Sequence, residues 1–286
     1  MRFGLAASAL IAAGPLSAQI PTPTIDTTAA DSQRVDSLRQ DATRRYLAAE
    51  SLSVRSLATL PDLGADGPRA AGSRVVLDRR AIAWRTAESV ADLLAEVPGV
   101  YVWRGGWFGR PMYANFRGRG ATGISWYLDG VPWTPLGPDS VGVDPARFSL
   151  ALLERVEIER WPGELRVHLY TPQYARRAPR SRIGIATGEF KITRYQGDLE
   201  YRWSSGMGLT VATEYFDAPA PTNVRGDARL TSTLIRTQWV PRPDRGVQLQ
   251  YYTQAPALDP YVGLTGDTLG ARLRGTQSDL QARAFL

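Results

Sequence analysis

The sequence predicts an α+β domain over residues 74–171, followed by an antiparallel all-β segment over residues 172–286. Two observations support this division. The first part carries one amphipathic helix pattern among several short apolar strand patterns. The second part changes to longer runs in which apolar and polar residues alternate, separated by clusters of Gly, Pro and Asp. The length of 286 residues suits about two domains.

The composition excludes most catalytic and metal chemistry. The chain has no cysteine and a single histidine, His168, so disulfides, thiolate metal sites, cysteine nucleophiles and multi-histidine metal sites are absent. Glu157 and Glu159 share one strand face beside Arg155, a pattern that indicates ion pairs more than acid–base catalysis. We therefore expect no enzyme, no catalytic residue, no metal site and no cofactor.

The net charge of +6 comes mostly from the last part of the chain, with one arginine cluster in residues 176–182. No run of basic residues with interleaved aromatics follows, so no nucleic-acid partner is expected. Residues 118–123 match the G-x-G-x-x-G pattern, but a strand pattern follows where a dinucleotide fold needs a helix. We expect no dinucleotide to bind there.

The N-terminal region resembles an export signal. Arg2 precedes an apolar stretch of 11 residues, which ends at Gly14 and Pro15 before small residues near Ala18. We expect a signal peptide over residues 1–18, a buried N-terminal helix being the alternative. Residues 19–73 then form a periplasmic segment, with a solvated helix over 31–50 and a Gly/Pro-rich linker over 61–73.

The α+β domain begins with a short strand over residues 75–77. A helix opens at Thr86 as its N-cap, presents one apolar face, and ends before Pro98 and Gly99. That apolar face consists of Val90, Leu93, Leu94 and Val97. Further strands are expected over residues 100–103, 113–117, 124–128, 155–159 and 166–169, with a turn at 129–130.

The all-β segment shows the clearest alternation over residues 198–203, 209–215 and 247–251. Strands of about ten residues with one apolar face, one polar face and frequent Tyr and Trp are typical of a transmembrane β-barrel. A soluble antiparallel sandwich has the same period and remains the alternative. The export signal favours the membrane.

Several segments of the α+β domain occur in a characteristic order. They are residues 89–94 with 97–100, residues 116–118, residues 127–132, and residues 153–158 followed by Arg160, Pro162 and Gly163. This series resembles the plug domain of TonB-dependent outer-membrane receptors, and the strand-rich remainder resembles the opening strands of their barrel. The resemblance implies an α+β plug domain followed by a partial outer-membrane β-barrel.

The resemblance also implies a function. The protein would import a scarce, bulky nutrient, such as an iron chelate, a cobalamin or a glycan, through a plugged barrel. Its partners would be a TonB-type energising protein of the inner membrane, outer-membrane lipid, and a small-molecule or glycan ligand. Trp107, Phe108 and Arg110, in the first Gly-rich loop, are the candidate ligand contacts, with Trp133 as a further one.

For the barrel contacts, the resemblance implies that three plug charges, Arg117, Glu154 and Glu157, form ion pairs with barrel residues; pairing within the plug is the alternative. Residues 182–286 supply about six strands, whereas closing a barrel around a plug takes roughly 22. We therefore expect the chain to be the N-terminal part of a larger receptor. A plug-like binding or structural module of the envelope, without transport, remains the alternative function.

Overall fold

The structure, a computed structural model, describes residues 37–45, 57–61, 73–106, 109–134, 142–220, 226–262, 268–269 and 272–286. The chain divides into two compact units, residues 1–49 and residues 50–286. In the first unit, residues 37–45 form a helix whose side chains are all exposed, inside the helix predicted over 31–50. The predicted signal peptide and most of the predicted linker lie outside the described residues.

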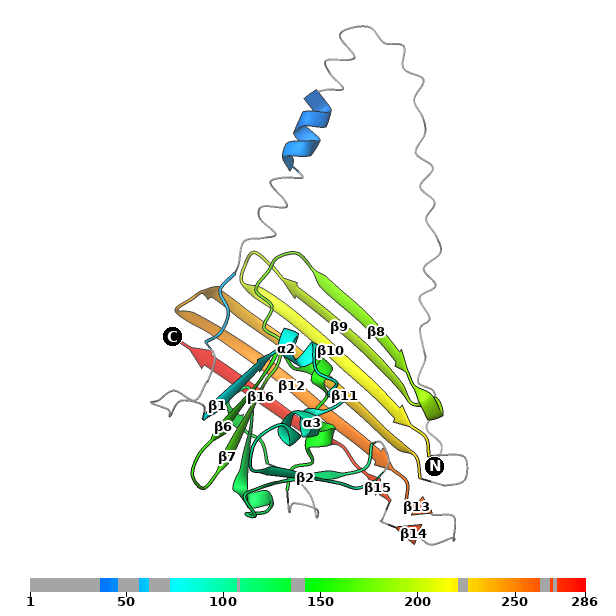
Figure 1. Cartoon of the computed structure of the whole chain (residues 1–286). Helices are drawn as coiled ribbons and strands as arrows, with labels where there is room; N and C mark the ends of the chain where they lie inside the picture. The colour runs from blue at the N-terminus through cyan, green and yellow to red at the C-terminus, as the bar shows by residue number, and fades with distance from the viewer. Residues whose placement is uncertain are drawn as a thin grey trace, which may run out of the picture. The chain divides into compact units, whose positions relative to one another are not determined.

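The second unit begins with an α+β domain (Figure 1). Its five-stranded sheet has the order β1-β6-β7-β4-β5, in which only β4 and β7 run parallel. A separate hairpin is formed by β2 and β3. The elements are β1 (Arg74–Asp78), α2 (Arg79–Ala83), α3 (Val90–Ala95), β2 (Val100–Arg104), β3 (Met112–Phe116), η1 (Ala121–Gly123), β4 (Ile124–Leu128), β5 (Val131–Pro132), η2 (Pro145–Arg147), η3 (Leu150–Leu152), β6 (Arg155–Arg160) and β7 (Leu165–Tyr170).

Helix α3 packs its predicted apolar face into the core of this domain. Val90, Leu93, Leu94 and Val97 are all buried, which confirms that face. The predicted start at Thr86 is wrong: Ser89 is the N-cap, and Asp92 accepts a hydrogen bond from its backbone N–H at 3.0 Å. In this pairing a carboxylate three residues after a serine N-cap accepts the backbone N–H of the cap. Three residues after Thr86 stands Ser89, which has no carboxylate.

The Gly-rich sequence of residues 118–123 ends in the single 3₁₀ turn η1 and leads directly into β4. Hence the structure places a strand where a dinucleotide fold has its helix. His168 is buried on β7, where its ring stacks on Tyr127 with centroids 4.6 Å apart.

The second part of this unit is a seven-stranded antiparallel sheet, called here the large sheet, with the order β15-β12-β11-β10-β9-β8 and with β16 also paired to β12. Beside it, β13 and β14 form a short hairpin. The elements are β8 (Arg180–Thr187), η4 (Glu189–Lys191), β9 (Thr193–Arg202), β10 (Met207–Ala218), β11 (Ala228–Arg242), β12 (Arg245–Leu258), β13 (Tyr261–Val262), β14 (Thr268–Leu269), β15 (Leu273–Arg274) and β16 (Gln277–Phe285).

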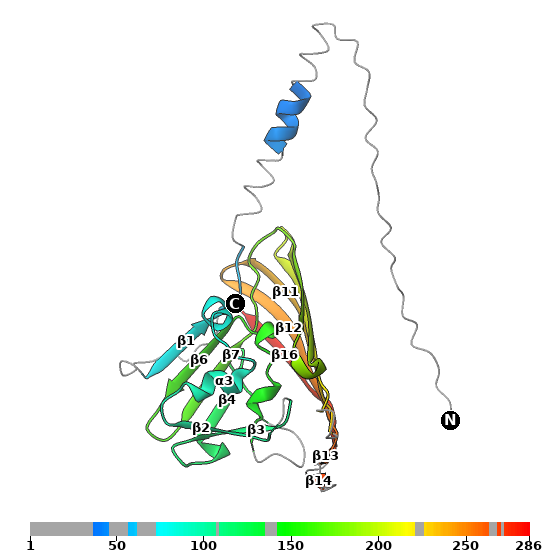
Figure 2. The same ribbon diagram turned by 45° about the vertical axis from the view of Figure 1, so that its right-hand side comes forward.

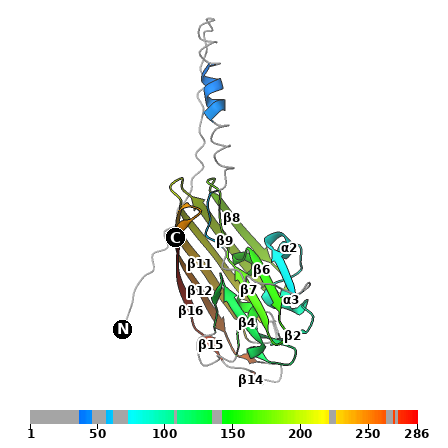
Figure 3. The ribbon, with the colours of Figure 1, turned by 90° about the vertical axis from the view of Figure 1, so that its left-hand side faces the viewer.

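The large sheet buries its polar face and exposes its apolar face. The α+β domain lies against one face of this sheet (Figures 2 and 3), and that face carries buried polar side chains such as Glu200, Arg236 and Gln250. The opposite face exposes large apolar side chains, among them Trp239 at 48% and Leu249 at 49%. A soluble sandwich needs the reverse arrangement, because its apolar faces form the core. Within the described residues, no helix has the length and apolar character needed to cross a membrane.

The ionised carboxylate of Asp92 stabilises the N-terminus of α3, and this contribution can be tested by its pH dependence. Burial raises the pKa of Asp92, but the Arg104 guanidinium at 2.6 Å and the backbone N–H groups of Glu88 and Ser89 outweigh burial and lower it below the ordinary 3.8. A lowered carboxyl pKa stabilises the fold above the unfolded pKa and loses that effect as the pH falls through the folded pKa. Asp92→Asn should therefore cost about 1 kcal/mol at pH 7.

The measurement is a series of urea titrations of wild type and Asp92→Asn between pH 7 and pH 2.5. The difference in unfolding free energy should shrink below the ordinary pKa of 3.8, where wild-type Asp92 also becomes protonated. A difference that stays constant down to pH 2.5 contradicts the ionic role of Asp92.

Candidate functional site

One aspartate of the α+β domain is the centre of its contact with the large sheet. Asp129 follows β4 in a turn with left-handed backbone, with φ of 50° at Asp129 and 83° at Gly130. The N–H of Thr171 donates to Asp129 Oδ1 at 2.9 Å, and the Thr171 hydroxyl donates to Oδ2 at 2.7 Å. These two bonds fix the carboxylate so that it faces the large sheet.

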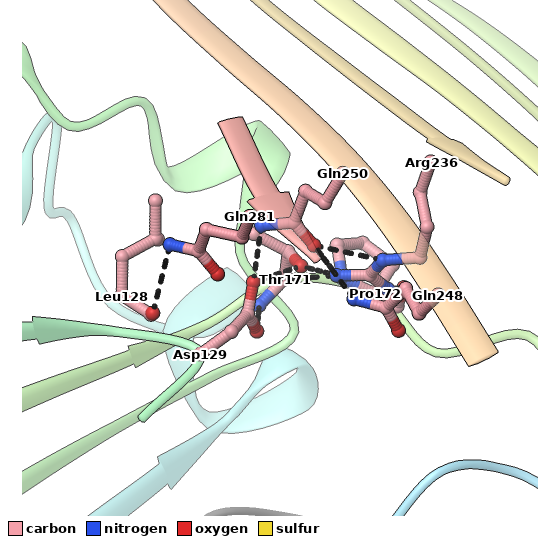
Figure 4. Close-up of polar contacts among 8 residues, drawn as sticks. All are labelled: Leu128, Asp129, Thr171, Pro172, Arg236, Gln248, Gln250 and Gln281. Carbon is pink, nitrogen blue, oxygen red and sulfur yellow. Dashed lines mark hydrogen bonds and ion pairs between the residues drawn. The ribbon is translucent and has the colours of Figure 1, made fainter. Parts of the chain in front are cut away.

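The large sheet supplies two partners from neighbouring strands. Arg236 on β11 and Gln250 on β12 lie opposite each other in register. Gln250 Nε2 donates to Asp129 Oδ2 at 2.7 Å, and Arg236 Nη2 lies 3.3 Å from the same oxygen. Arg236 Nε also donates to Gln250 Oε1 at 2.9 Å, while the guanidinium contacts Thr171 Oγ1 and the carbonyl of Pro172. Figure 4 shows these four side chains converging; we call Asp129, Thr171, Arg236 and Gln250 the Asp129 cluster.

The Asp129 cluster is fully removed from solvent. The side chains of Asp129 and Arg236 are each 1% exposed. A buried ion pair stabilises a fold only when further hydrogen bonds satisfy its remaining polar atoms, and here Thr171 and Gln250 supply them. The cluster therefore fixes one position of the α+β domain on the sheet, because a shifted position would leave a buried charge unpaired.

Further polar contacts extend along the same interface. Gln281 on β16 donates to the Leu128 carbonyl at 3.4 Å, and Gln254 on β12 donates to the Arg147 carbonyl at 2.9 Å. On β9, Arg194 pairs with Glu88 at 2.9 Å. The interface thus combines hydrogen bonds and ion pairs from several strands with apolar packing, such as that of Trp133 on Tyr252.

A cavity of about 490 Å³ lies between the α+β domain and the ends of β9–β12 that carry the longer connections. Its apolar lining includes Met112, Phe148, Phe216, Leu230 and Leu258, and its rim carries charged side chains. On that rim, Arg104 pairs with Asp92 at 2.6 Å and Arg147 pairs with Asp144 at 3.4 Å. The result is an apolar hollow whose rim charges neutralise each other in pairs.

Burial governs the ionisation of Asp144 on this rim. It raises the pKa of the carboxyl, although Arg147 and the backbone N–H groups of Met112 and Ala146 act in the opposite direction. Asp144 also caps η2 through the N–H of Ala146 at 3.0 Å. It therefore ties the rim of the cavity to the fold of the domain.

The predicted ligand contacts fall in different environments. Trp107 and Phe108 lie outside the described residues. Arg110 is buried, and its guanidinium donates to the carbonyls of Asp259 and Gly226 near the strand ends. Trp133 is buried with its ring against Phe148 and Tyr252. Neither Arg110 nor Trp133 lies on the open recognition surface that the sequence indicated, because each fills a packed position between domain and sheet.

The predicted plug–barrel charges bind mainly inside the α+β domain. Glu157 on β6 is buried between Arg74 of β1 and Arg155, whose Nε lies 2.8 Å away. Glu154 pairs with Arg79 at 3.6 Å; burial raises its pKa, while the charge of Arg180 on β8 lowers it.

Arg117 is exposed, with its guanidinium 5.1 Å from the centre of the Phe116 ring. Glu157 pairs inside the domain because β6 lies between β1 and β7, so that Arg74 reaches it from the neighbouring strand β1 and Arg155 from β6 itself.

Sequence reasoning missed the Asp129 cluster. The sequence indicates only a turn at Asp129, and Arg236 lies in a stretch whose alternation is weak. The one signal available is a charged residue at an inward position of a strand, since a lone arginine on the polar face of a barrel strand needs a carboxylate partner. Nothing in the sequence says which carboxylate that is.

This fold was compared with protein families, curated proteins and solved structures. Residues 68–167 match the family model of the TonB-dependent Receptor Plug Domain. No curated protein matches the sequence. Among solved structures, the ferric enterobactin receptor of Pseudomonas aeruginosa is 14% identical with a TM-score of 0.58, over 76% of this chain and 39% of the receptor.

Two other similar structures lead to the same fold. The siderophore receptor PiuA of Acinetobacter baumannii is 16% identical with a TM-score of 0.54, over 73% of this chain and 30% of that one. The copper transporter OprC is 14% identical with a TM-score of 0.58, over 74% and 34%. The chain thus spans less than half the length of each of these receptors and transporters. Residues 68–167 thus match a TonB-dependent receptor plug domain, and the antiparallel strands that follow have the fold of part of the barrel in these structures.

Proposed function

We propose that the chain is part of an outer-membrane receptor that takes up a scarce, bulky ligand past its plug. The observation that supports this most is the inverted burial of the large sheet, with polar side chains against the plug and large apolar side chains outside. Lipid surroundings make an outward row such as Trp239, Val247 and Leu249 favourable.

The lengths of the connections orient the sheet. Short turns join β9 to β10 and β11 to β12, whereas longer segments join β10 to β11 and β12 to β15. Outer-membrane barrels have short periplasmic turns and longer extracellular loops. The long-connection end, with its cavity, therefore faces outward, and the short-turn end faces a TonB-type energising protein in the periplasm.

The ligand is proposed to meet the plug at the long-connection end. Gly109 lines the cavity there, with φ of +73° and a position where an added Cβ would lie 2.6 Å from Ala228. Trp107 and Phe108, the predicted ligand contacts, come directly before Gly109 in the sequence. Similar structures are named for ferric enterobactin, for siderophores and for copper. Among the candidate ligands we therefore favour an iron chelate.

The membrane placement can be tested by single-cysteine labelling, since the chain has no cysteine of its own. Leu249→Cys carries a nitroxide on the outer face, and Gln248→Cys carries it on the inner face of the same strand. In isolated outer membranes, oxygen should relax the Leu249 label strongly and a water-soluble nickel complex should relax it weakly. Equal accessibility of the Leu249 label to both quenchers would place the sheet in water and end the proposal.

The ligand contact is tested with ferric enterobactin as the probe. The double variant Trp107→Ala/Phe108→Ala should weaken its binding to membranes by about tenfold or more, as expected for aromatic anchors of an interface. Trp161→Ala, which changes a partly exposed tryptophan in the β6–β7 turn, is the matched control. If wild type does not bind the probe, the ligand class is wrong; if it binds and the double variant binds equally well, the contact residues are wrong.

A further inference from the structure

We propose that residues 57–61, called here the strap, are fastened to the large sheet by Arg202, and that release of the strap loosens the Asp129 cluster. The proposal goes beyond uptake of a ligand, because it concerns how the two ends of the plug are held. It rests on the buried Arg202, on Gly208, which leaves space for its side chain, and on the short segment of residues 171–175, which both Arg202 and Arg236 bind.

Arg202 occupies a site built for it by three adjacent strands. It is the last residue of β9, it is 2% exposed, and it lies opposite Gly208 of β10, which in turn lies opposite Gln238 of β11. A Cβ added at Gly208 would lie 2.3 Å from Arg202 Cδ, so only glycine lets the side chain cross this strand. With its amide oxygen facing the guanidinium, Gln238 accepts from Arg202 Nη1 at 2.7 Å.

The guanidinium of Arg202 binds both chain segments that flank the plug. Nη2 donates to the carbonyl of Ala58 at 2.9 Å, and Nη1 donates to the carbonyl of Tyr174 at 3.1 Å. The two segments also bind each other, because the N–H of Leu57 donates to the carbonyl of Ala175 at 2.6 Å. Leu60 is 5% exposed, so the strap is packed as well as hydrogen-bonded.

We call the contacts of Arg202 with Ala58 and Tyr174 the Arg202 clamp. The short linker of residues 171–175, which follows β7, connects this clamp to the Asp129 cluster. At its first end, Thr171 and Pro172 bind Arg236; at its other end, Tyr174 binds Arg202 and Ala175 binds Leu57. Leu60 of the strap and Thr171 of the cluster also line the same cavity of about 560 Å³. Residues 171–175 are the hydrogen-bonded path between the strap and the cluster. Coupling between two sites is carried by such continuous chains of bonded and packed residues.

The test is hydrogen exchange, read by mass spectrometry, on the full chain in lipid vesicles. Arg202→Met should speed amide exchange in the strap at least tenfold, and exchange at Thr171, whose N–H binds Asp129, should follow. Arg182→Gln is the control, since it removes an ion pair between the half-exposed Arg182 of β8 and Asp198 of β9. Exchange in β10 and β11 should stay at wild-type rates in both variants.

A second variant tests the strap without touching Arg202. Leu57→Pro removes the donor to Ala175 and should also speed exchange at Thr171. If Arg202→Met leaves strap exchange unchanged, the clamp is wrong. If either variant frees the strap while exchange at Thr171 stays at the wild-type rate, the coupling to the cluster is wrong. If Arg202→Met does not fold, Arg202→Lys takes its place, because it keeps the charge but loses the guanidinium that binds Ala58 and Tyr174 together, and Leu57→Pro decides the coupling to the cluster.

Discussion

Asp129→Ala should lower the free energy of unfolding by about 3–5 kcal/mol. The variant removes a carboxylate bound to the guanidinium of Arg236 in the Asp129 cluster, and Arg236 stays buried between β11 and the plug. A buried charge without its partner loses its Coulomb attraction and keeps its full desolvation penalty. Gln250 also loses the acceptor for its amide N–H, which adds to the loss.

The measurement is a urea titration of the full chain in lipid vesicles, followed by tryptophan fluorescence. Asp217→Ala is the control, because it breaks an exposed pair with Arg229 at 3.0 Å and should cost less than about 1 kcal/mol. The double variant Asp129→Ala/Arg236→Met should recover part of the loss, since it removes both charges. A cost for Asp129→Ala no larger than that of Asp217→Ala would show that the cluster does not hold the plug.

The polar character of the interface has a functional consequence. Apolar surfaces that separate in water lose stabilisation in proportion to the area exposed, whereas separated polar groups regain hydrogen bonds with water. A plug held by the Asp129 cluster and by contacts such as Gln281 to Leu128 is therefore specific in position and yet separable. The uptake function proposed above would require both properties.

The elements of the plug were predictable from the sequence because they are locally encoded. The strand pattern of β4 and the apolar face of α3 depend on residues a few positions apart, and the structure confirms both. The start of α3 was misplaced by three residues, since the pairing of Ser89 with Asp92 competes with Thr86 as a start signal and only the folded backbone decides between them.

The Asp129 cluster was not predictable, because its members come from distant parts of the chain. Asp129 and Arg236 are separated by 107 positions, and their meeting depends on the docking of a whole domain on a whole sheet. Alternation in β11 and β12 shows that each strand has two different faces. It does not show which carboxylate meets the polar face, so Glu154 and Glu157 were as plausible as Asp129 until the packing was known.

The packing of α3 leads to the second large effect. Leu94→Ala should destabilise the chain by about 2–5 kcal/mol, because the side chain is 0% exposed inside the core of the plug and its removal leaves a cavity. Helix propensity does not cause the loss, since alanine is the better helix former. Leu93 and Val97 line the same face, and the interior is too closely packed to collapse around the missing atoms.

The control for Leu94→Ala is another leucine in a helix. Leu38 lies in the helix of residues 37–45 and is 62% exposed, so Leu38→Ala should change the free energy of unfolding by less than about 0.5 kcal/mol. Both variants are compared with wild type in the same urea titration as Asp129→Ala. Because Leu94 lies in the plug core and Asp129 is buried at the contact with the large sheet, their effects should add to within about 0.5 kcal/mol. A Leu94→Ala variant as stable as Leu38→Ala would mean that α3 does not pack in the core, and the plug fold would have to be rejected with it.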